Sequence, residues 1–284
     1  MPLTRKTAQS LIRRALAEDA AGRDITSRAI LPANARIRAK IIAKQPGILA
    51  GGPLAAWTFQ TLDRSLRCRL ARRDGAHLSR GQAILTVEGR ARSIFAAERT
   101  ALNFLGHLSG IATLTRRFVE RVPRRVKILD TRKTLPGLRA LEKYAVRIGG
   151  GDNHRWDLED AVLIKTNHLK ALGRSRAAAI EQAIRRARWH ARGKRVEVEV
   201  TNRAEFEAAL LARPDAILLD NWPVARLREA VRLRGRRRSL RLEASGGVTL
   251  ANIRAVGRSG VDDISIGRLT HSAPALDVSL KVIS

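Results

Sequence analysis

The chain has 284 residues, of which 44% are hydrophobic and only 4% are aromatic. That length suits one barrel domain or two ordinary domains, with a core built mainly from Ala, Val, Leu and Ile. The 55 Lys and Arg residues outnumber the 26 Asp and Glu residues and give a formal charge of +29. No apolar run approaches the roughly 20 residues of a membrane-spanning helix, and the single Cys68 excludes an intrachain disulfide. We therefore expect a cytoplasmic protein without membrane association.

The excess positive charge is scattered along the chain, in pairs such as Arg13-Arg14, Arg72-Arg73 and Arg185-Arg186. Nucleic-acid binding is one interpretation, because Lys and Arg neutralise phosphate groups. The sequence has neither a single basic tail nor the Cys and His spacing of a zinc module. We favour a broadly Arg-rich surface, part of whose charge steers small anionic substrates, and we do not expect nucleic acid as a partner.

The first part of the chain predicts a small α+β unit. Thr7–Ala17 has apolar residues at helical spacing, and Arg36–Ala43 alternates basic and apolar residues as a half-exposed strand does. A further helix and two short strands are predicted at residues 54–62, 66–71 and 83–87. His77 lies in the loop between those two strands, and we expect it on the surface rather than in a ligand set.

A long helical stretch follows over Ile94–Val122, and we expect it to break near Gly106 or Gly110. The charged pair Glu98-Arg99 near its start is typical of a solvated helix face.

Strands and helices alternate after Pro123. Six short β-branched or Leu-rich runs recur, at residues 126–129, 162–165, 196–200, 216–219, 240–244 and 264–267. Helical runs separate several of them, which is the pattern of a parallel sheet covered by helices. Six strands are fewer than the eight of a closed α/β barrel, so we predict an incomplete barrel. The predicted organisation is an N-terminal α+β domain over residues 1–110 and a barrel domain over residues 111–284, whose C-terminal tail is able to pack back on the first domain.

Basic residues gather between residues 130 and 168. Arg132-Lys133 follows one predicted strand, His154-Arg155 follows the three glycines 149–151, and Lys165 ends another strand. Arg binds carboxylate or phosphate bidentately, Lys adds a point charge, and glycines allow backbone N–H groups to approach an anion. Ordinary surface charge, or a buried ion pair of Lys165 with Glu199 or Asp220, is the alternative. We favour anion binding.

Acidic and small residues end the other strands. Glu197 and Glu199 are two apart on a strand and share its inward face, where carboxylates need Lys, Arg or a metal. We expect Glu197 to be a structural ion-pair partner. Ser245-Gly246-Gly247 and Gly267 follow the last two predicted strands, where barrels often bind phosphate. His271, just beyond, is either part of that site or a helix cap.

One long motif carries a family resemblance. The pattern TRKTxPGLRxLEKYAVRxGGGxNHR over residues 131–155, followed by VLIKxNH over residues 162–168, resembles quinolinate phosphoribosyltransferases, also called nicotinate-nucleotide pyrophosphorylases (carboxylating). Later segments agree, so the resemblance spans nearly the whole chain: 196–200, 218–221, 242–247 and 265–272. It implies the type II phosphoribosyltransferase fold, an N-terminal α+β sandwich domain plus an irregular, open α/β barrel. It also implies transfer of phosphoribosyl from phosphoribosyl pyrophosphate to quinolinate with decarboxylation, giving nicotinate mononucleotide, pyrophosphate and CO2 for NAD biosynthesis.

The same resemblance implies roles for individual residues. The substrate-binding residues would be Arg99, Arg132, Lys133, His154, Arg155, Lys165, Ser245, Gly246, Gly247, Gly267 and His271. The catalytic residues would be Lys133, Lys165, Glu199 and Asp220. Glu199 and Asp220 would hold Mg²⁺, largely through water, as hard oxygen ligands do. Arg99 would reach in from a partner subunit, which implies a homodimer or a hexamer of dimers.

Two departures from the family pattern stand out. The family usually has a second glycine near Arg23, and it commonly has an acidic residue where Thr166 stands. Thr166 should reduce the negative charge near the site and alter metal or phosphate binding.

Two alternatives also stay open. One is a phosphoribosyltransferase of the same fold with another acceptor, as in molybdenum-transport-associated relatives, which typically lack the full Lys-x-Asn-His motif kept at residues 165–168. The other is a nucleic-acid-binding protein that reuses the fold.

Overall fold

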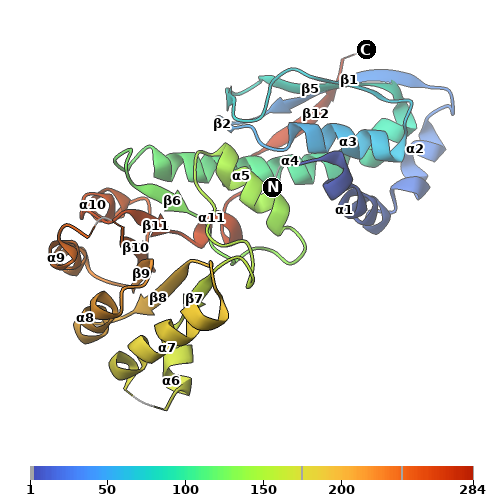
Figure 1. Ribbon diagram of the computed structural model, residues 1–284. Coiled ribbons are helices and arrows are strands. Elements are labelled where there is room, and N and C mark those ends of the chain that lie inside the picture. Colours follow the sequence, from blue (N-terminus) through green and yellow to red (C-terminus); the bar gives the residue numbers. More distant parts are fainter. Residues whose placement is uncertain (1–2, 174, 238, 284) are drawn as a thin grey trace. The chain divides into compact units, whose positions relative to one another are not determined.

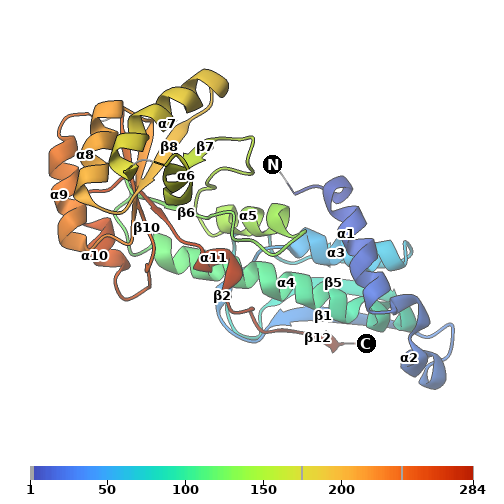
Figure 2. The same ribbon diagram turned by 90° about the horizontal axis from the view of Figure 1, so that it is seen from below.

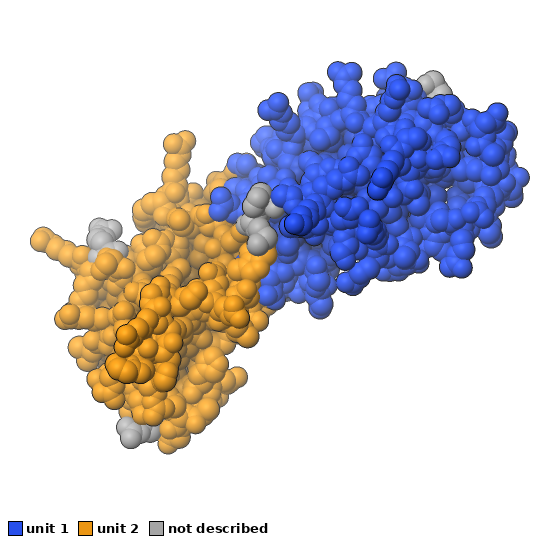
Figure 3. Space-filling view, turned by 45° about the vertical axis from the view of Figure 1, so that its right-hand side comes forward, with its two compact units in different colours: residues 1–116, 134–150, 268–284 blue, residues 117–133, 151–267 orange. Residues whose placement is uncertain are grey.

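The computed structural model describes residues 3–173, 175–237 and 239–283. The chain divides into two compact units, which are coloured separately in Figure 3. Unit 1 comprises Met1–Arg116, Thr134–Gly150 and Arg268–Ser284, and unit 2 comprises Arg117–Lys133 and Gly151–Gly267. Two later segments thus belong to unit 1. The division expected from the sequence has a boundary after residue 110 and a C-terminal tail able to pack back, and it does not include the return of residues 134–150.

Unit 1 is built on an antiparallel sheet with the strand order β12-β1-β5-β3. Its strands are β1 (Arg36–Ala43), β3 (Arg67–Leu70), β5 (Ala83–Arg90) and β12 (Val278–Val282), beside a small pair of β2 (Gly47–Ile48) and β4 (His77–Leu78). Its helices are α1 (Arg5–Glu18), η1 (Ala21–Arg23), α2 (Ile25–Ile30), α3 (Gly52–Leu62), most of α4 (Ala91–Val119), α5 (Arg139–Ile148) and α11 (Arg268–His271). Helices α1 and α3 lie along the sheet (Figure 1).

The alternating pattern of β1 is confirmed. Ala39, Ile41 and Ala43 are fully buried, while the residues that alternate with them, such as Arg38 and Lys40, are more exposed, as expected for a strand with one face in the core. The tail strand β12 pairs antiparallel with β1, from Ala39 opposite Val282 to Ala43 opposite Val278. The last strand of the chain therefore completes the edge of the sheet in unit 1.

The expected break in the long helix is wrong, because α4 is continuous from Ala91 to Val119. Its glycines serve close packing instead. A Cβ on Gly106 would lie 2.9 Å from the carbonyl oxygen of Leu276, and one on Gly110 would lie 2.1 Å from that of Pro274. Leu276 N–H also donates to the Gly106 carbonyl oxygen at 2.9 Å. The cost of glycine in a helix interior, about 1 kcal/mol each, is offset by this contact.

The part of the long motif that lies in α5 has a structural role in unit 1. Glu142 is fully buried, and its Oε1 lies 2.9 Å from His107 Nε2. Its Oε2 accepts the backbone N–H of Leu135 at 3.2 Å and so fixes the turn before the helix. Tyr144 donates its hydroxyl to Asp74 Oδ2 at 2.6 Å. These residues of the motif therefore hold the segment that follows Lys133.

Unit 2 contains a sheet of six parallel strands in the order β6-β11-β10-β9-β8-β7. The strands are β6 (Lys127–Leu129), β7 (Val162–Ile164), β8 (Val196–Val200), β9 (Ala216–Asp220), β10 (Arg241–Ser245) and β11 (Asp263–Ser265). The helices are α6 (Thr166–Ala171), α7 (Arg176–His190), α8 (Arg203–Ala212), α9 (Val224–Arg234) and α10 (Ile253–Gly257). Helices α7 to α10 lie on the outer side of the curved sheet (Figures 1 and 2).

The six predicted strands are confirmed, each within two residues of its expected bounds. Within the described residues the two edge strands, β6 and β7, do not pair with each other. The prediction of an irregular, open α/β barrel is therefore confirmed. None of the helices in the described part of the chain has the length and apolar content that crossing a membrane requires.

Candidate active site at the carboxyl ends of the strands

The carboxyl ends of the six strands meet along one edge of unit 2. Ser245 is level with Asp220 on one side and with Ser265 on the other. Ser265 is in turn level with Leu129 at the end of β6. The candidate residues that lie in or just after the strands along this edge are Arg132, Lys133, Lys165, Glu199, Asp220, Ser245, Gly246, Gly247 and Gly267. In α/β barrels this is the edge that carries the chemistry.

Two arginines lie within electrostatic reach of each other at this edge. The pKa of Arg155 is lowered, first because the side chain is partly buried and second because the positive charge of Arg132 lies nearby. Arg155 donates from Nη1 to the carbonyl oxygen of Ala161 at 3.0 Å. Arg132 Nε is buried and has no hydrogen-bond partner among the described residues. Two guanidinium groups held this way favour a bound anion, which would relieve their repulsion.

Glu199 and Asp220 stand on neighbouring strands, with lysines close by. The pKa of Asp220 is raised, first by burial and then by the negative charge of Glu199, while Lys133 and Lys165 act in the opposite direction. The four side chains therefore lie within electrostatic reach of one another. Lys165 itself is exposed at the start of α6, which argues against the alternative of a buried ion pair there.

Thr166 makes direct contact with the acidic pair. Its backbone N–H and its hydroxyl donate to Glu199 Oε1, at 3.2 Å and 2.9 Å. An acidic side chain in this place would repel Glu199, whereas the threonine hydroxyl binds it. The two hydrogen bonds from Thr166 thus orient the Glu199 carboxylate.

The loop after β10 requires its glycines. Gly246 has a φ of 83° and Gly247 a φ of 59°, a region that other residues rarely adopt. A Cβ on Gly246 would lie 2.2 Å from Asn221 Oδ1. Ser245 Oγ accepts a hydrogen bond from Ser265 Oγ at 3.0 Å, which joins the ends of β10 and β11. Turns of this kind present successive backbone N–H groups to anions.

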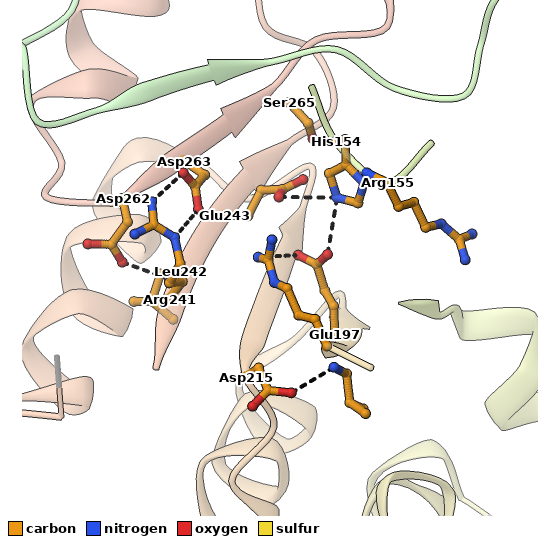
Figure 4. A network of polar contacts seen from close by, with 12 residues as sticks. His154, Arg155, Glu197, Asp215, Arg241, Leu242, Glu243, Asp262, Asp263 and Ser265 are labelled. Carbon is orange, nitrogen blue, oxygen red and sulfur yellow. Dashed lines mark hydrogen bonds and ion pairs between the residues drawn. The ribbon is translucent and has the colours of Figure 1, made fainter. Parts of the chain in front are cut away.

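His154 lies inside unit 2 among three buried carboxylates (Figure 4). Its Nε2 lies 3.1 Å from Glu197 Oε2 and 3.4 Å from Glu243 Oε2. Its backbone N–H donates to Asp130 Oδ1 at 2.9 Å. The expectation that Glu197 is an ion-pair partner is confirmed. Asp130 and Glu243 were missed at the sequence level, although a glutamate inside the otherwise apolar run of β10 is a signal, since a buried carboxylate needs a partner.

The carboxylates control the proton of the His154 ring. Burial by itself would lower the pKa of His154, but Glu197 and Glu243 outweigh it and raise that pKa to about 10. Burial, and then the charge of Glu197, raise the pKa of Glu243 to about 7. In the other direction, Arg155 N–H donates to His154 Nδ1 at 2.8 Å, which opposes a second ring proton.

A ring proton on Nε2 lies between the two glutamates, whose negative charges stabilise it. Ligand atoms of His154, Glu197 and Glu243 lie within 4.8 Å of one another, which is close enough for the three side chains to hold a metal ion. The two glutamates each form an ion pair with the His154 ring, which holds the three side chains together.

Two candidate residues belong to unit 1. Arg99 is exposed on α4. His271 ends the short helix α11, and its Nδ1 lies 2.7 Å from Ser272 Oγ. The fold of unit 2 thus assembles the other candidates, from Arg132 to Gly267, without these two.

Comparison with known sequences decides the family. The family model described as "Quinolinate phosphoribosyl transferase, N-terminal domain" matches residues 24–109, and the one for the C-terminal domain matches residues 111–281. The nicotinate-nucleotide pyrophosphorylase (carboxylating) of Mycobacterium leprae is 44% identical over 278 residues, which cover 96% of each chain. The chain belongs to the quinolinate phosphoribosyltransferase family. A probable member from Bacillus subtilis is 40% identical and covers 93% of this chain and 90% of its own.

Solved structures of quinolinate phosphoribosyltransferase relatives have the same fold. NadC from Streptococcus pyogenes superposes with a TM-score of 0.92 at 38% identity and covers 100% of both chains. The nicotinate-nucleotide pyrophosphorylase of Francisella tularensis also gives a TM-score of 0.92 at 38% identity, over 99% of this chain and 98% of its own. The α+β unit and the open barrel are therefore the fold of this family.

Proposed function

We propose that this protein transfers phosphoribosyl from phosphoribosyl pyrophosphate to quinolinate, with decarboxylation, in NAD biosynthesis. The observation that carries the proposal is the pair Arg132 and Arg155, held near each other despite their repulsion, at the same strand ends as the acidic pair Glu199 and Asp220. Quinolinate offers two carboxylates to such arginines, and the donor offers phosphates and an electron-poor carbon to the remaining groups. The single Cys68 accords with a reducing compartment, and we include cytoplasmic location in the proposal.

The reaction depends on binding the anionic groups and stabilising the positive charge that develops, and it does not need a covalent nucleophile. The pyridine nitrogen attacks C1 of the ribose, and the C1–O bond breaks so that pyrophosphate leaves with the electron pair. Loss of the 2-carboxylate as CO2 leaves an electron pair on C2, which takes up a proton. Glu199 and Asp220 stabilise the positive charge that develops on the ribose. Arg132, Arg155, Lys133 and Lys165 hold the anionic groups in place.

Mg²⁺ is part of the proposal. Asp220 feels the charge of Glu199 across neighbouring strands, and such a pair of carboxylates fits a hard divalent cation that keeps several waters. When bound, Mg²⁺ would neutralise the departing pyrophosphate. Glu199 and Asp220 would hold it through water, and Thr166 would keep Glu199 in orientation.

Phosphate binding and assembly complete the proposal. We assign the 5′-phosphate of the donor to the loop Ser245–Gly247, with Gly267 and His271, because its positive-φ glycines suit an anion. We also propose a homodimer or a hexamer of dimers in which Arg99 acts in the partner's site. Its exposed position on α4 supports this role. His154 contributes to the site indirectly, because its Nδ1 accepts the backbone N–H of Arg155 and so helps to position that residue.

A coupled assay tests the function. Purified protein, quinolinate, phosphoribosyl pyrophosphate and Mg²⁺ would be mixed, and CO2 and nicotinate mononucleotide followed together. We expect both products in equal amounts. Binding of phosphoribosyl pyrophosphate without any reaction of quinolinate would overturn the choice of acceptor and favour another acceptor on the same fold.

Arg132→Ala gives the matching site test. It should abolish quinolinate binding with the fold intact, because one of the two guanidinium groups is lost. Arg228→Ala, on the exposed surface of α9, is the control and should bind quinolinate normally. Unchanged quinolinate affinity in Arg132→Ala would sink that assignment.

A further inference from the structure

Three buried carboxylates of unit 2 have no part in the proposed reaction. Asp130 and Glu243 are 0% exposed and Glu197 is 2% exposed. Removing carboxylates from water is costly unless they are paired, so their presence in a core points to a specific partner. That shared partner is His154, whose side chain is 9% exposed.

The contacts of His154 come from three separate elements. Glu197 on β8 and Glu243 on β10 point at its ring from two sides, as Figure 4 shows, at 3.1 Å and 3.4 Å from Nε2. Asp130, at the end of β6, accepts its backbone N–H at 2.9 Å. Both the ring and the backbone of this residue are thus held within the protein.

His154 also fixes its neighbours in the chain. Its Nδ1 accepts the backbone N–H of Arg155 at 2.8 Å. Just before it, Asp152 N–H donates to the Ile128 carbonyl oxygen at 2.8 Å, and Asp130 N–H donates to the Asp152 carbonyl oxygen at 3.2 Å. The segment from Asp152 to Arg155 is therefore held to β6, and to the residue just after it, by hydrogen bonds. Strand β6 is the one that leads into Arg132.

We propose that Asp130, Glu197 and Glu243 are positioning residues that act through His154. They anchor the loop of residues 152–155 and so hold the Arg155 guanidinium next to Arg132, ready for a carboxylate of the substrate. The part of this inference that concerns quinolinate rests on the proposed function.

The repulsion between the two arginines explains why an anchor is needed. Burial, and then the positive charge of Arg132, lower the pKa of Arg155. Without substrate the two guanidinium groups therefore repel each other. A loop held only by its own backbone would relax and separate them. Ordering the site before the substrate arrives requires contacts that do not involve the substrate, and the buried cluster supplies them.

Amide hydrogen exchange tests the anchor without any substrate. The variants are Glu197→Gln and Glu243→Gln, which keep the side-chain shape and remove the charge. We expect exchange at the amides of His154 and Arg155 to rise at least tenfold, while amides of β9 keep their protection. Glu207→Gln, an exposed glutamate of α8, is the control and should change neither region. Unchanged exchange at residues 154 and 155 in both variants would overturn the proposal.

Separate binding measurements test the consequence. By calorimetry, each variant should bind quinolinate at least tenfold more weakly, and phosphoribosyl pyrophosphate within twofold of the unaltered protein. A merely structural role would weaken both ligands together, or neither, and either result would overturn the proposal. If one variant fails to fold, Asp130→Asn replaces it, because Asp130 holds the same loop from β6.

The two failures are distinguishable. If the unaltered protein does not bind quinolinate, the proposed function fails. The exchange experiment then decides the anchor alone: faster exchange at residues 154 and 155 supports it, and protected amides overturn it.

Discussion

Two charged regions of unit 2 handle their charge in opposite ways. Inside the barrel, His154 is matched by buried carboxylates at distances of 3.1 Å and 3.4 Å. At the carboxyl end of α7, basic residues and one aromatic residue surround an open hollow of about 450 Å³, lined by Arg185, Arg186, Arg188, Trp189, His190 and Arg192. Trp189 is 66% exposed there, and the Arg192 guanidinium lies 4.9 Å from its ring centre.

The difference follows from the dielectric environment. In a poorly solvated interior each charge interacts strongly, so it needs a partner in a fixed geometry. At the surface water and salt screen like charges within roughly 8–10 Å, so arginines gather without matching acids. In the α7 cluster only Arg188 has an ion pair among the described residues, with Asp215 at 3.5 Å. Much of the net charge of +29 therefore costs little folding free energy, whereas a single interior carboxylate needs a partner in a fixed position.

The largest expected effect is on stability, from Glu243→Ala. The change leaves a cavity and removes one of the two carboxylates beside His154, so the free energy of unfolding should fall by about 2–4 kcal/mol. Urea denaturation measures it. Glu207→Ala at the surface should stay within about 0.5 kcal/mol. A loss below about 1 kcal/mol for Glu243→Ala would erase the contrast between the two regions.

Asp63→Asn extends the comparison to a buried carboxylate of unit 1. Arg90 donates to Asp63 at 2.9 Å and holds the pKa of that carboxyl well below its usual value of 3.8. A lowered folded-state pKa stabilises above pH 3.8 and loses that stabilisation as the pH falls. At pH 7 the variant should be less stable by about 1–2 kcal/mol. The gap should shrink below pH 4 in urea titrations, and a gap independent of pH would contradict this assignment.

Thr166→Val should have a smaller effect, confined to activity. It removes the hydroxyl that donates to Glu199 Oε1, a bond worth about 1 kcal/mol. Steady-state kinetics should show kcat/KM lowered by about fivefold. Thr166→Ser keeps the hydroxyl and is expected to retain most of the activity. A loss of activity in Thr166→Ser with none in Thr166→Val would show that the methyl group, not the hydroxyl, matters.

The smallest effect is expected at the end of α7. The double change Arg185→Ser with Arg186→Ser removes exposed charge, so the free energy of unfolding should change by less than about 0.5 kcal/mol. Because like charges are removed, any change at low salt should be stabilising. Urea denaturation at two salt concentrations checks both statements. A loss above about 1 kcal/mol would mean that these arginines are held in specific contacts.

Local patterns were enough to predict much of the fold. The six strands of the barrel follow from short β-branched runs, and β1 from its alternation. Contacts between distant segments were not predictable. Gly106 and Gly110 resemble helix breakers until the segment with Pro274 and Leu276 packs on them.

The same division holds for the candidate site. Arg132, Lys165 and Asp220 were found because polar residues that end parallel strands must meet at one edge. Glu243 was not found, because its partner His154 lies far away in the sequence and only the folded sheet brings them together. Thr166 was recognised as unusual, but its bond to Glu199 depends on the spacing of β7 and β8.

The pairing of β12 with β1 has a consequence for synthesis of the protein on the ribosome. Strand β1 (Arg36–Ala43) is translated early, but its neighbour β12 (Val278–Val282) is translated only after all of unit 2. During that interval one side of β1 exposes unpaired backbone groups, which other strands are able to join. The nascent chain is thus exposed to misassembly while the barrel is being made. The free edge of β1 is covered only once β12 has been translated.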